Sequence, residues 1–396
     1  MFEFKPEKIR KDFPVLKKGI YFDSACMSLK PMQVIGKMNE YYEEYTACAG
    51  RSAHLLSKKT EAEVNSARNE VRKLINAKDR EIVFARNTTE GINLVANSLG
   101  LKSGDEVILS DKEHNSNLIP WLKLAKKGIK VIIAKSNPDN TFNLDAYRKL
   151  FTKNTKLVSV VHQSNLDGVT NPIKEIAKIA NENGVLCMAD GAQSVPGKEI
   201  DVKKLNVDFL AFSGHKMMGP AGTGVLYGKK ELLENLDQFM VGGETVMNST
   251  YDSYIPEEVP AKFEAGLQDY GGIIGLGEAA KYLRGIGLSR IEKHEIKLNK
   301  AIKEELENIS RIKILGPEAE KRAGIFSFTI DGIDIHHTAK MLEASKKIMV
   351  RSGAHCVHSW FNSHNMKGSV RASLYAYNTM EETQIFIDEV KKIARM

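Results

Sequence analysis

The chain has 396 residues, of which 42% are hydrophobic and 27% are charged, values that are ordinary for a globular protein. Its 57 basic and 50 acidic residues give a net charge of +7, but lysine-rich stretches such as residues 297–307 are mixed with glutamate, as on a solvated helix. We therefore expect no nucleic-acid partner, and no stretch approaches the ~20 apolar residues that a membrane span needs.

The four cysteines are scattered along the chain and form no Cys-x-x-Cys pair: Cys26, Cys48, Cys187 and Cys356. Residues 1–12 are charged and lack the apolar centre of a signal peptide. Scattered cysteines without a secretion signal are expected to be reduced thiols. We therefore expect a cytoplasmic protein.

From residue 81 to residue 228 the sequence alternates short apolar runs with amphipathic stretches. Several runs are apolar on both faces, as expected of parallel strands in a buried sheet. Pro172–Asn183 begins with proline and is followed by Gly184, which predicts a helix. The pattern predicts an α/β fold with a mostly parallel central sheet and helices on both faces. The predicted strands are Glu81–Arg86, Glu106–Asp111, Lys130–Lys135, Leu157–His162, Val185–Asp190, Phe209–Ser213 and Gly224–Tyr227.

After Gly272 the sequence changes to long helical patterns followed by short strands. Because 396 residues exceed one typical core, we expect two domains. The large domain is predicted over residues 21–272, and a smaller α+β domain over residues 273–396 together with residues 1–20. Its predicted elements are helices over Ile273–Gly285 and Leu288–Ile309, strands at Ile312–Leu315, Gly324–Ile330, Ile348–Arg351 and Ser369–Ala376, and a last helix that opens at Thr379 with a capping box to Glu382.

Two charged residues follow neighbouring strands of the predicted sheet. Asp190 ends one strand, and Lys216 lies on the turn after the next strand along the chain. Taken alone, the aspartate could cap a helix and the lysine could lie on the surface. Together they match the needs of pyridoxal 5'-phosphate (PLP), because an amine forms its Schiff base and a carboxylate keeps its ring nitrogen protonated. The pair predicts a PLP site at the ligand-binding edge of the sheet.

A phosphate site is expected in the segment Arg86–Gly91, which joins the first predicted strand to a helical pattern at Ile92–Leu99. Hydroxyl groups, here those of Thr88 and Thr89, and free N–H groups at a helix N-terminus bind phosphate well. The segment lacks a Gly-x-Gly-x-x-Gly motif, so NAD is not expected there.

The sequence resembles the class V aminotransferase group of fold-type I PLP enzymes, and within it the SUF-type (group II) cysteine desulfurases and selenocysteine lyases. The resemblance extends from about residue 8 to the end of the chain. The matching segments are Tyr21–Ala25, Thr88–Asn97, Ala189–Gln193, Ser213–Lys216, Phe263–Gly266 and Arg371–Ser373.

The resemblance implies roles for further residues around the cofactor. His114 is expected to stack on the ring, Asn165 to contact the ring hydroxyl, and Gln193 to lie near it. The expected phosphate ligands are Thr88, Thr89, Ser213 and His215. Tyr270 takes the place of a threonine that contacts phosphate across a dimer, and Arg51 also matches a segment that crosses the interface. The resemblance therefore implies a homodimer with shared active sites.

The reaction implied by the resemblance is the conversion of L-cysteine to L-alanine. Lys216 carries the cofactor and acts as the base at Cα. Cys356, on a loop after Arg351 and His355, attacks the substrate sulfur and holds it as a persulfide for an acceptor or scaffold protein. An arginine near a thiol stabilises its thiolate. Arg371 matches the ligand of the substrate carboxylate, and Arg51, Arg351 and Asn165 complete the expected substrate site.

Departures from the family pattern leave alternatives open. Ala354 and Gly50 replace histidines, and Val357–Ser359 replaces the usual segment after the cysteine. A class V aminotransferase, a selenocysteine lyase or an epimerase would use the same PLP site, and a sulfur-carrier scaffold would need a partner protein. No metal site is expected, since His355, Cys356 and His358 lack a fourth ligand. Cys26 could be a second working thiol, although core packing is the ordinary role of such a cysteine.

Overall fold

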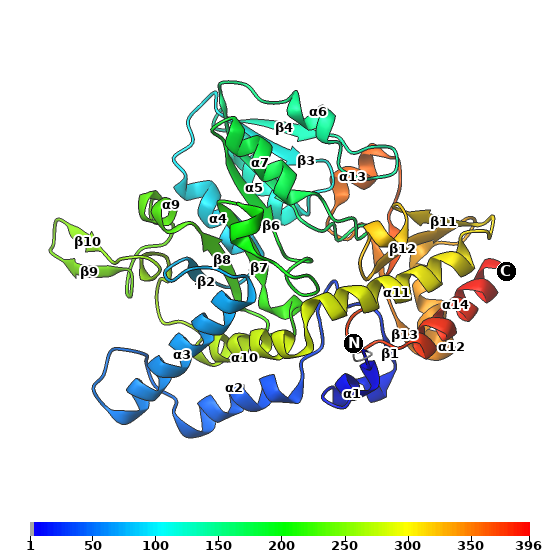
Figure 1. Ribbon diagram of the computed structural model, residues 1–396, viewed down its shortest axis with the longest axis horizontal. Helices are drawn as coiled ribbons and strands as arrows, with labels where there is room; N and C mark the ends of the chain where they lie inside the picture. Colours follow the sequence, from blue (N-terminus) through cyan, green and yellow to red (C-terminus); the bar gives the residue numbers. More distant parts are fainter. Residues whose placement is uncertain (1–3) are drawn as a thin grey trace.

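A seven-stranded sheet forms the centre of the protein in the computed structural model, which describes residues 4–396 (Figure 1). Its strands follow the order β2-β8-β7-β6-β5-β3-β4, and all neighbours are parallel except the two pairs that include β8. The predicted α/β architecture and all seven strands are confirmed. The strands are β2 (Ile82–Ala85), β3 (Glu106–Ser110), β4 (Lys130–Ala134), β5 (Thr155–Val161), β6 (Leu186–Asp190), β7 (Phe209–Ser213) and β8 (Gly224–Gly228).

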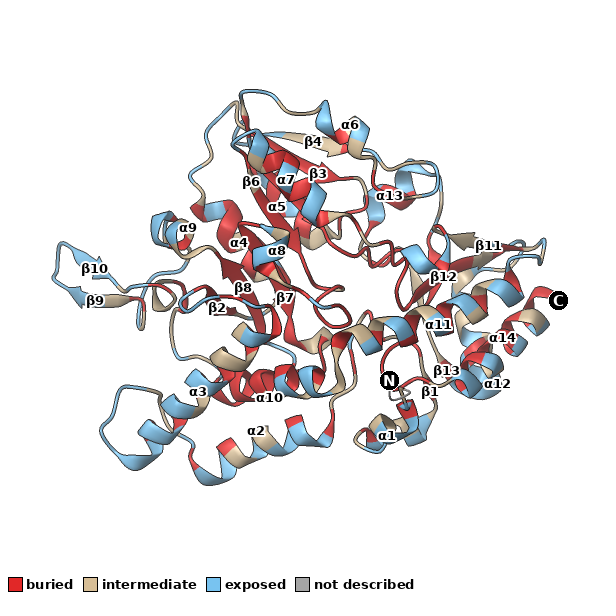
Figure 2. Cartoon of the chain, viewed as in Figure 1, coloured by how far each residue is buried: buried red, intermediate tan, exposed pale blue. Residues whose placement is uncertain are grey.

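Side chains of this sheet point alternately into two hydrophobic cores, one on each face. Most of the sheet is coloured as buried in Figure 2. Val158 and Val160 of β5 belong to one core, whereas Leu157 belongs to the other. Because both faces are buried, the strands carry apolar residues on both faces. The first core also contains side chains of α2 (Met32–Glu44), α3 (Leu55–Leu74), α7 (Ile173–Glu182) and α10 (Tyr270–Ile286), and the second contains those of α4 (Thr88–Ser98) and α5 (Asn115–Ala125).

A second, antiparallel sheet has the strand order β11-β12-β15-β14 and is covered by three helices. The predicted capping box is confirmed at the last helix, where Thr379 Oγ1 accepts the Glu382 N–H at 3.1 Å and the Thr379 N–H donates to Glu382 Oε2 at 3.2 Å. The elements are β11 (Ile312–Leu315), β12 (Ile325–Ile330), β14 (Arg351–Gly353), β15 (Ser369–Ser373), α11 (Leu288–Leu306), α12 (Ile335–Lys346) and α14 (Met380–Ala394).

The prediction of a single strand over Ile348–Arg351 was wrong. The first half, β13 (Ile348–Met349), pairs in parallel with β1 (Ile20–Tyr21), and the chain then turns so that β14 pairs with β15. The partner of β13 comes from the opposite end of the sequence, so no local pattern reveals the change of sheet. The register of the second pairing sets Arg351 directly opposite Arg371.

The division of the chain at residue 272 stays a prediction. The predicted boundary falls inside α10, which begins at Tyr270 and packs against α2 and α3. The helix ends before Gly287, whose φ of 92° favours glycine, and α11 begins at the next residue. We propose that the boundary lies at Gly287.

The matching segment Phe263–Gly266 has a clear structural role. Arg68 of α3 donates from Nη1 and Nη2 to the two carboxylate oxygens of Glu264 at 2.7 and 2.8 Å, and the Phe84 N–H of β2 donates to Glu264 Oε1 at 2.7 Å. A bidentate arginine–carboxylate pair of this kind fixes orientation as well as distance. Glu264 therefore joins α3 to the edge of the large sheet.

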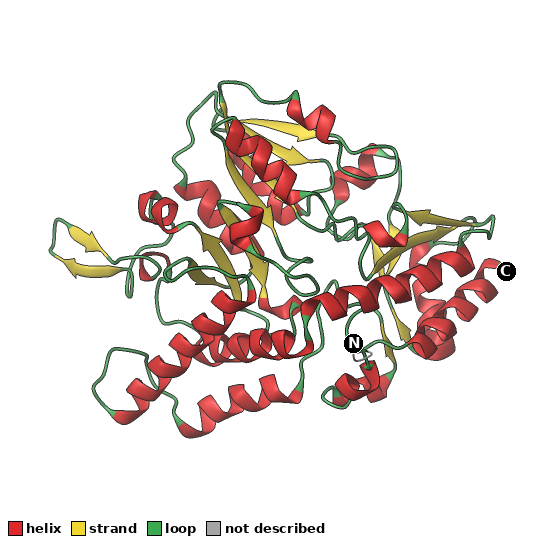
Figure 3. Cartoon of the chain, viewed as in Figure 1, coloured by secondary structure: helices red, strands yellow, loops and turns green. Residues whose placement is uncertain are grey.

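Short elements occupy the periphery, and the β9–β10 hairpin protrudes from the body (Figure 3). Within residues 4–396, no helix is long and apolar enough to span a bilayer, and no cluster of three or more histidine, cysteine, aspartate or glutamate side chains is arranged for a metal ion. The peripheral elements are α1 (Pro6–Arg10), α6 (Leu144–Arg148), α8 (Val202–Leu205), α9 (Lys230–Asn235), β9 (Val246–Ser249), β10 (Tyr254–Pro256) and α13 (His358–Ser363), and the 3-10 turns η1 (Pro14–Lys18), η3 (Ala261–Phe263) and η4 (Ala319–Lys321).

Candidate active site

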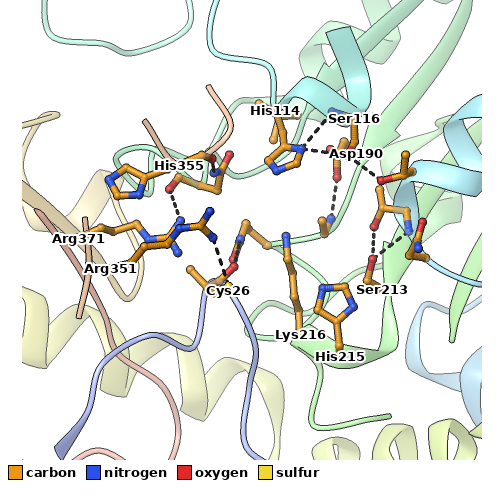
Figure 4. Close-up of a pocket in the computed structure, with 18 residues that line it drawn as sticks. Cys26, His114, Ser116, Asp190, Ser213, His215, Lys216, Arg351, His355 and Arg371 are labelled. Carbon is orange, nitrogen blue, oxygen red and sulfur yellow. Dashed lines mark hydrogen bonds between the residues drawn. The ribbon is translucent and has the colours of Figure 1, made fainter. Parts of the chain in front are cut away.

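Polar side chains gather at the edge of the large sheet where the parallel strands β5, β6 and β7 end. They line a cavity of about 250 Å³ that also receives side chains from β14 and β15 of the smaller sheet (Figure 4). The predicted site residues that line it are Thr88, Thr89, His114, Asn165, Asp190, Gln193, Ser213, His215, Lys216, Arg351 and Arg371. Predicted residues from seven separate regions of the sequence thus meet in one space, whereas Cys356, Tyr270 and Arg51 are not among its lining residues.

Lys216 and Asp190 both face this cavity, as the sequence predicts. Asp190 is the last residue of β6 and is 2% exposed, and its Oδ1 accepts the Ala192 N–H at 2.9 Å. Lys216 ends the short turn η2 (Gly214–Lys216) that follows β7. Loss of hydration lowers the pKa of Lys216, and Asp190 opposes that shift. A lysine with a lowered pKa has more of the neutral amine that attacks a carbonyl group.

Hydroxyl groups surround the N-terminus of α4 on one side of the cavity. The Thr88 N–H donates to Ser213 Oγ at 2.9 Å, and the hydroxyl groups of these two residues lie 2.6 Å apart. Thr89 Oγ1 and Ser116 Oγ are 2.7 Å apart. Asn87 caps the helix by accepting the Glu90 N–H at 3.0 Å. The helix N-terminus and these hydroxyl groups provide donors that suit a phosphate group.

His114 is the N-cap residue of α5 and is held in one orientation. Its Nδ1 accepts the Ser116 N–H at 3.0 Å and lies 3.0 Å from Ser116 Oγ. Burial, followed by the charges of Lys216 and Arg351, lowers the pKa of His114 to about 3. The ring is therefore neutral, and its proton resides on Nε2 because Nδ1 is an acceptor. A flat, neutral imidazole is suited to stacking on an aromatic ring.

Three buried polar atoms of residues that line the cavity have no hydrogen-bond partner among residues 4–396: Asn165 Oδ1, His355 Nδ1 and Arg371 Nε. Asn165 is held by its other side-chain atom, since Nδ2 donates to the His355 carbonyl at 2.6 Å. Gln193 Nε2 donates to the Ala25 carbonyl at 2.8 Å. Because buried polar atoms are normally paired, these unpaired atoms indicate that this space fits a polar ligand.

Arg371 and Arg351 stand opposite each other on β15 and β14 and bring positive charge to the cavity. Arg371 is 1% exposed; its Nη1 donates to the Asn165 carbonyl at 3.0 Å and its Nη2 to Asp23 Oδ1 at 3.3 Å. Arg351 Nη1 donates to Cys26 Sγ at 3.2 Å, and Nη2 lies 3.8 Å from Cys356 Sγ. A pair of guanidinium groups at one end of a cavity suits the carboxylate of a substrate.

Cys356 lies on the loop between β14 and α13, next to the cavity but outside its lining. The loop is unusual because His355 and Cys356 have φ values of 49° and 60°, a left-handed conformation that residues other than glycine seldom adopt. The Cys356 carbonyl accepts the Asn115 N–H of α5 at 2.8 Å, which ties the loop to the His114 turn. Of the cations named in the sequence analysis, Arg351 lies beside this thiol, with its Nη2 3.8 Å from Cys356 Sγ.

His355 does not supply charge to the neighbouring thiol. Its ring is 2% exposed, Nε2 lies 2.9 Å from Ser369 Oγ, and burial with the two arginines lowers the pKa of His355 to about 2. The ring is therefore neutral and cannot stabilise a thiolate at Cys356. Of the two residues that precede this thiol on the loop and its strand, Arg351 carries the charge that can.

Arg51 and Tyr270 lie away from the cavity of their own chain. The Arg51 side chain is 52% exposed and its Nε lies 2.5 Å from Glu244 Oε1, in the segment that leads into β9. Tyr270 begins α10 and is 7% exposed. Their expected role across a dimer interface stays a prediction.

Asp23 and Ser116 received no role in the sequence analysis, and for Cys26 core packing was favoured over a second working thiol. Asp23 lies within a matching segment, yet only the fold shows that its carboxylate binds Arg371. Ser116 follows His114 by two positions, and a serine just after a strand–helix turn is a signal that could have been used. Cys26 lines the cavity, so a role in core packing does not describe its position.

Comparisons with known proteins agree along the whole chain. The family model "Aminotransferase class-V" matches residues 20–386. A protein of Pyrococcus abyssi named "Probable cysteine desulfurase" is 42% identical over 98% of each chain, and one of Methanothermobacter thermautotrophicus with the same name is 38% identical over 100% of each. The solved apo structure of a cysteine desulfurase from Thermococcus onnurineus superposes with a TM-score of 0.96 at 39% identity and covers 100% of both chains.

The fold, the cavity at the ends of the parallel strands and these full-length matches all lead to the same family. This chain belongs to the class-V aminotransferases.

Proposed function

We propose that this chain is a PLP-dependent cysteine desulfurase that converts L-cysteine to L-alanine and collects the sulfur as a persulfide on Cys356. The observation that carries the proposal is the position of the Arg351 guanidinium, which lies inside the cavity with Lys216 and also 3.8 Å from Cys356 Sγ. An aminotransferase has no need of a thiol at this place. The full-length relatives named cysteine desulfurases support the same reaction.

The proposed cofactor site uses groups that the cavity already presents. Asp190 would hold the ring nitrogen, His114 would stack on the ring, and Asn165 Oδ1, which lacks a partner, would accept the ring hydroxyl, with Gln193 beside it. When bound, PLP supplies the electron sink that weakens bonds at Cα and Cβ of an amino acid. The phosphate would be held by Thr88, Thr89, Ser213 and His215.

The remaining residues bind the substrate and move its proton and sulfur. Arg371, fixed by Asp23 and with Nε unpaired, would bind the substrate carboxylate. Lys216 Nζ, with its lowered pKa, would take the proton from Cα. The Cys356 thiolate, stabilised by Arg351, would attack the substrate sulfur. Cys356 lies just outside the cavity lining, within 3.8 Å of the Arg351 guanidinium.

The proposal predicts equal amounts of alanine and persulfide sulfur from L-cysteine. In the presence of a thiol reductant, which releases the sulfur, alanine and sulfide should form in a ratio of about one to one. Both products are measured in the same reaction by amino-acid analysis and a colorimetric sulfide assay. An α-keto acid product without sulfide would contradict the proposal and favour an aminotransferase, and formation of D-cysteine would favour an epimerase. Product formation only when an acceptor protein is added would favour a sulfur-carrier scaffold.

We further propose a cytoplasmic homodimer in which each active site borrows residues from the partner subunit and sulfur leaves to an acceptor protein. The four free cysteines support a reducing location. The exposed Arg51 side chain, outside its own cavity, supports a role at the partner's site.

A mixing experiment tests the shared site. Lys216→Ala and Arg51→Ala should each be inactive as homodimers. After random exchange of subunits, half of the dimers would be mixed and would contain one whole site of two, so about a quarter of the wild-type activity should return. Native mass spectrometry must first show that mixed dimers have formed. If mixed dimers are present and no activity returns, Arg51 acts within its own subunit.

A further inference from the structure

Cys26 is the thiol that lies inside the cavity. It is a lining residue together with Lys216 and Asp190, whereas Cys356 is not (Figure 4). The sulfur of Cys26 therefore faces the same space as the proposed base.

The Arg351 guanidinium lies between the two thiols. Its Nη1 donates to Cys26 Sγ at 3.2 Å, and its Nη2 lies 3.8 Å from Cys356 Sγ. A guanidinium is a planar fork whose two ends can serve two anionic partners at once. Either sulfur can therefore be the stabilised thiolate while the other carries a substituent.

The backbone holds Cys26 in place. The Cys26 N–H donates to the Asp23 carbonyl at 3.0 Å, the Ala25 N–H donates to Ser373 Oγ at 3.0 Å, and the Ala25 carbonyl accepts Gln193 Nε2 at 2.8 Å. The thiol is thus fixed at the cavity wall.

We propose that Cys26 is a second sulfur carrier, which takes the outer sulfur from the Cys356 persulfide. The Cys26 thiolate attacks the terminal sulfur, a new Cys26 S–S bond forms, and the S–S bond at Cys356 breaks. The terminal hydrogen stays on the transferred sulfur, and Cys356 leaves as a thiolate that Arg351 stabilises. One S–S bond replaces another, so the step needs no oxidant or reductant. This inference rests on the proposed desulfurase activity.

The transfer changes how many sulfur atoms one subunit can hold. A single carrier stops after one turnover when no acceptor or reductant is present, because its thiol is occupied. Transfer to Cys26 frees Cys356 for a second turnover. The two thiols together would hold two sulfur atoms.

The test is a burst experiment on the PLP-loaded enzyme with excess L-cysteine and neither reductant nor acceptor, counting alanine in the first seconds after mixing. We expect about two alanines per subunit for the wild type and about one for Cys26→Ala, as each thiol can hold one persulfide. Cys48→Ser, which changes a thiol outside the cavity, should keep the wild-type burst. A wild-type burst of about one would overturn the second carrier and leave the proposed function standing, whereas no burst at all would refute the proposed function itself.

Mass mapping of the wild-type enzyme after the burst makes the result independent of how well any variant folds. Alkylation followed by proteolysis should find a persulfide on the Cys26 peptide as well as on the Cys356 peptide. Cys356→Ala should carry none on Cys26. A Cys26 persulfide in Cys356→Ala would overturn the proposed direction, and a disulfide between the two cysteines with released sulfide would show attack on the inner sulfur instead.

Discussion

Replacement of Lys216 by alanine should lower the rate of alanine formation from L-cysteine by about 10⁴-fold or more. The change removes both the amine that attaches the cofactor and the base that moves the Cα proton, and a positioned base alone contributes about 10²–10⁴-fold. Noncovalently bound cofactor should remain, because the Asp190 and Thr88 contacts are untouched. The measurements are steady-state alanine formation and the absorbance of the bound cofactor.

Lys30 provides the matched control for this prediction. Burial lowers the pKa of Lys30 to about 8, so its amine is also reactive, but it does not line the cavity. Reduction of the wild-type enzyme with borohydride should place the pyridoxyl group on the Lys216 peptide, and Lys30→Ala should give the same peptide. A label on Lys30, Lys229 or Lys230 would show that the attachment site was assigned to the wrong residue.

Replacement of Cys356 by alanine should leave cofactor and substrate binding intact and lower sulfide release by about 10³-fold or more, as expected when a covalent nucleophile is removed. The side chain is outside the cavity lining, so the ring contacts and Arg371 are unchanged. The spectral change on adding L-cysteine should therefore persist while sulfide production is lost. Cys48→Ala is the control for loss of a thiol elsewhere. Sulfide production at the wild-type rate by Cys356→Ala would mean that another group attacks the substrate sulfur.

The large sheet could be predicted from the sequence because its strands are buried on both faces and carry apolar runs, as at Val107–Leu109. Such runs depend only on local composition. The split of Ile348–Arg351 between two sheets could not be predicted, since β13 has the N-terminal strand β1 as its partner. Pairing between the two ends of a chain leaves no periodic signal in either.

The candidate site also has parts that could be predicted from the sequence and parts that could not. Lys216 and Asp190 could be predicted because Asp190 ends β6 and Lys216 ends the turn after β7. The carboxyl ends of parallel neighbouring strands lie at the same edge of a sheet, which brings the two side chains together. The contacts of Arg351 with two thiols could not, because they depend on the register of β14 against β15 and on the left-handed turn at Cys356. The neutral state of His355 likewise results from its burial against Ser369, which its position next to a cysteine does not disclose.

β1 pairs with β13, and the Ala25 N–H, further along the chain, donates a hydrogen bond to Ser373 Oγ. These contacts have a consequence for folding during protein synthesis. Chains fold from the N-terminus as they leave the ribosome, but here the N–H groups of Ile20, Phe22, Ser24 and Ala25 have their acceptors beyond residue 346. The seven-stranded sheet can therefore form on the nascent chain while the wall that carries Cys26 and Asp23 is still open. The arginines that face these residues are among the last to be translated, so we expect the proposed site for the substrate carboxylate to be complete only in a finished chain.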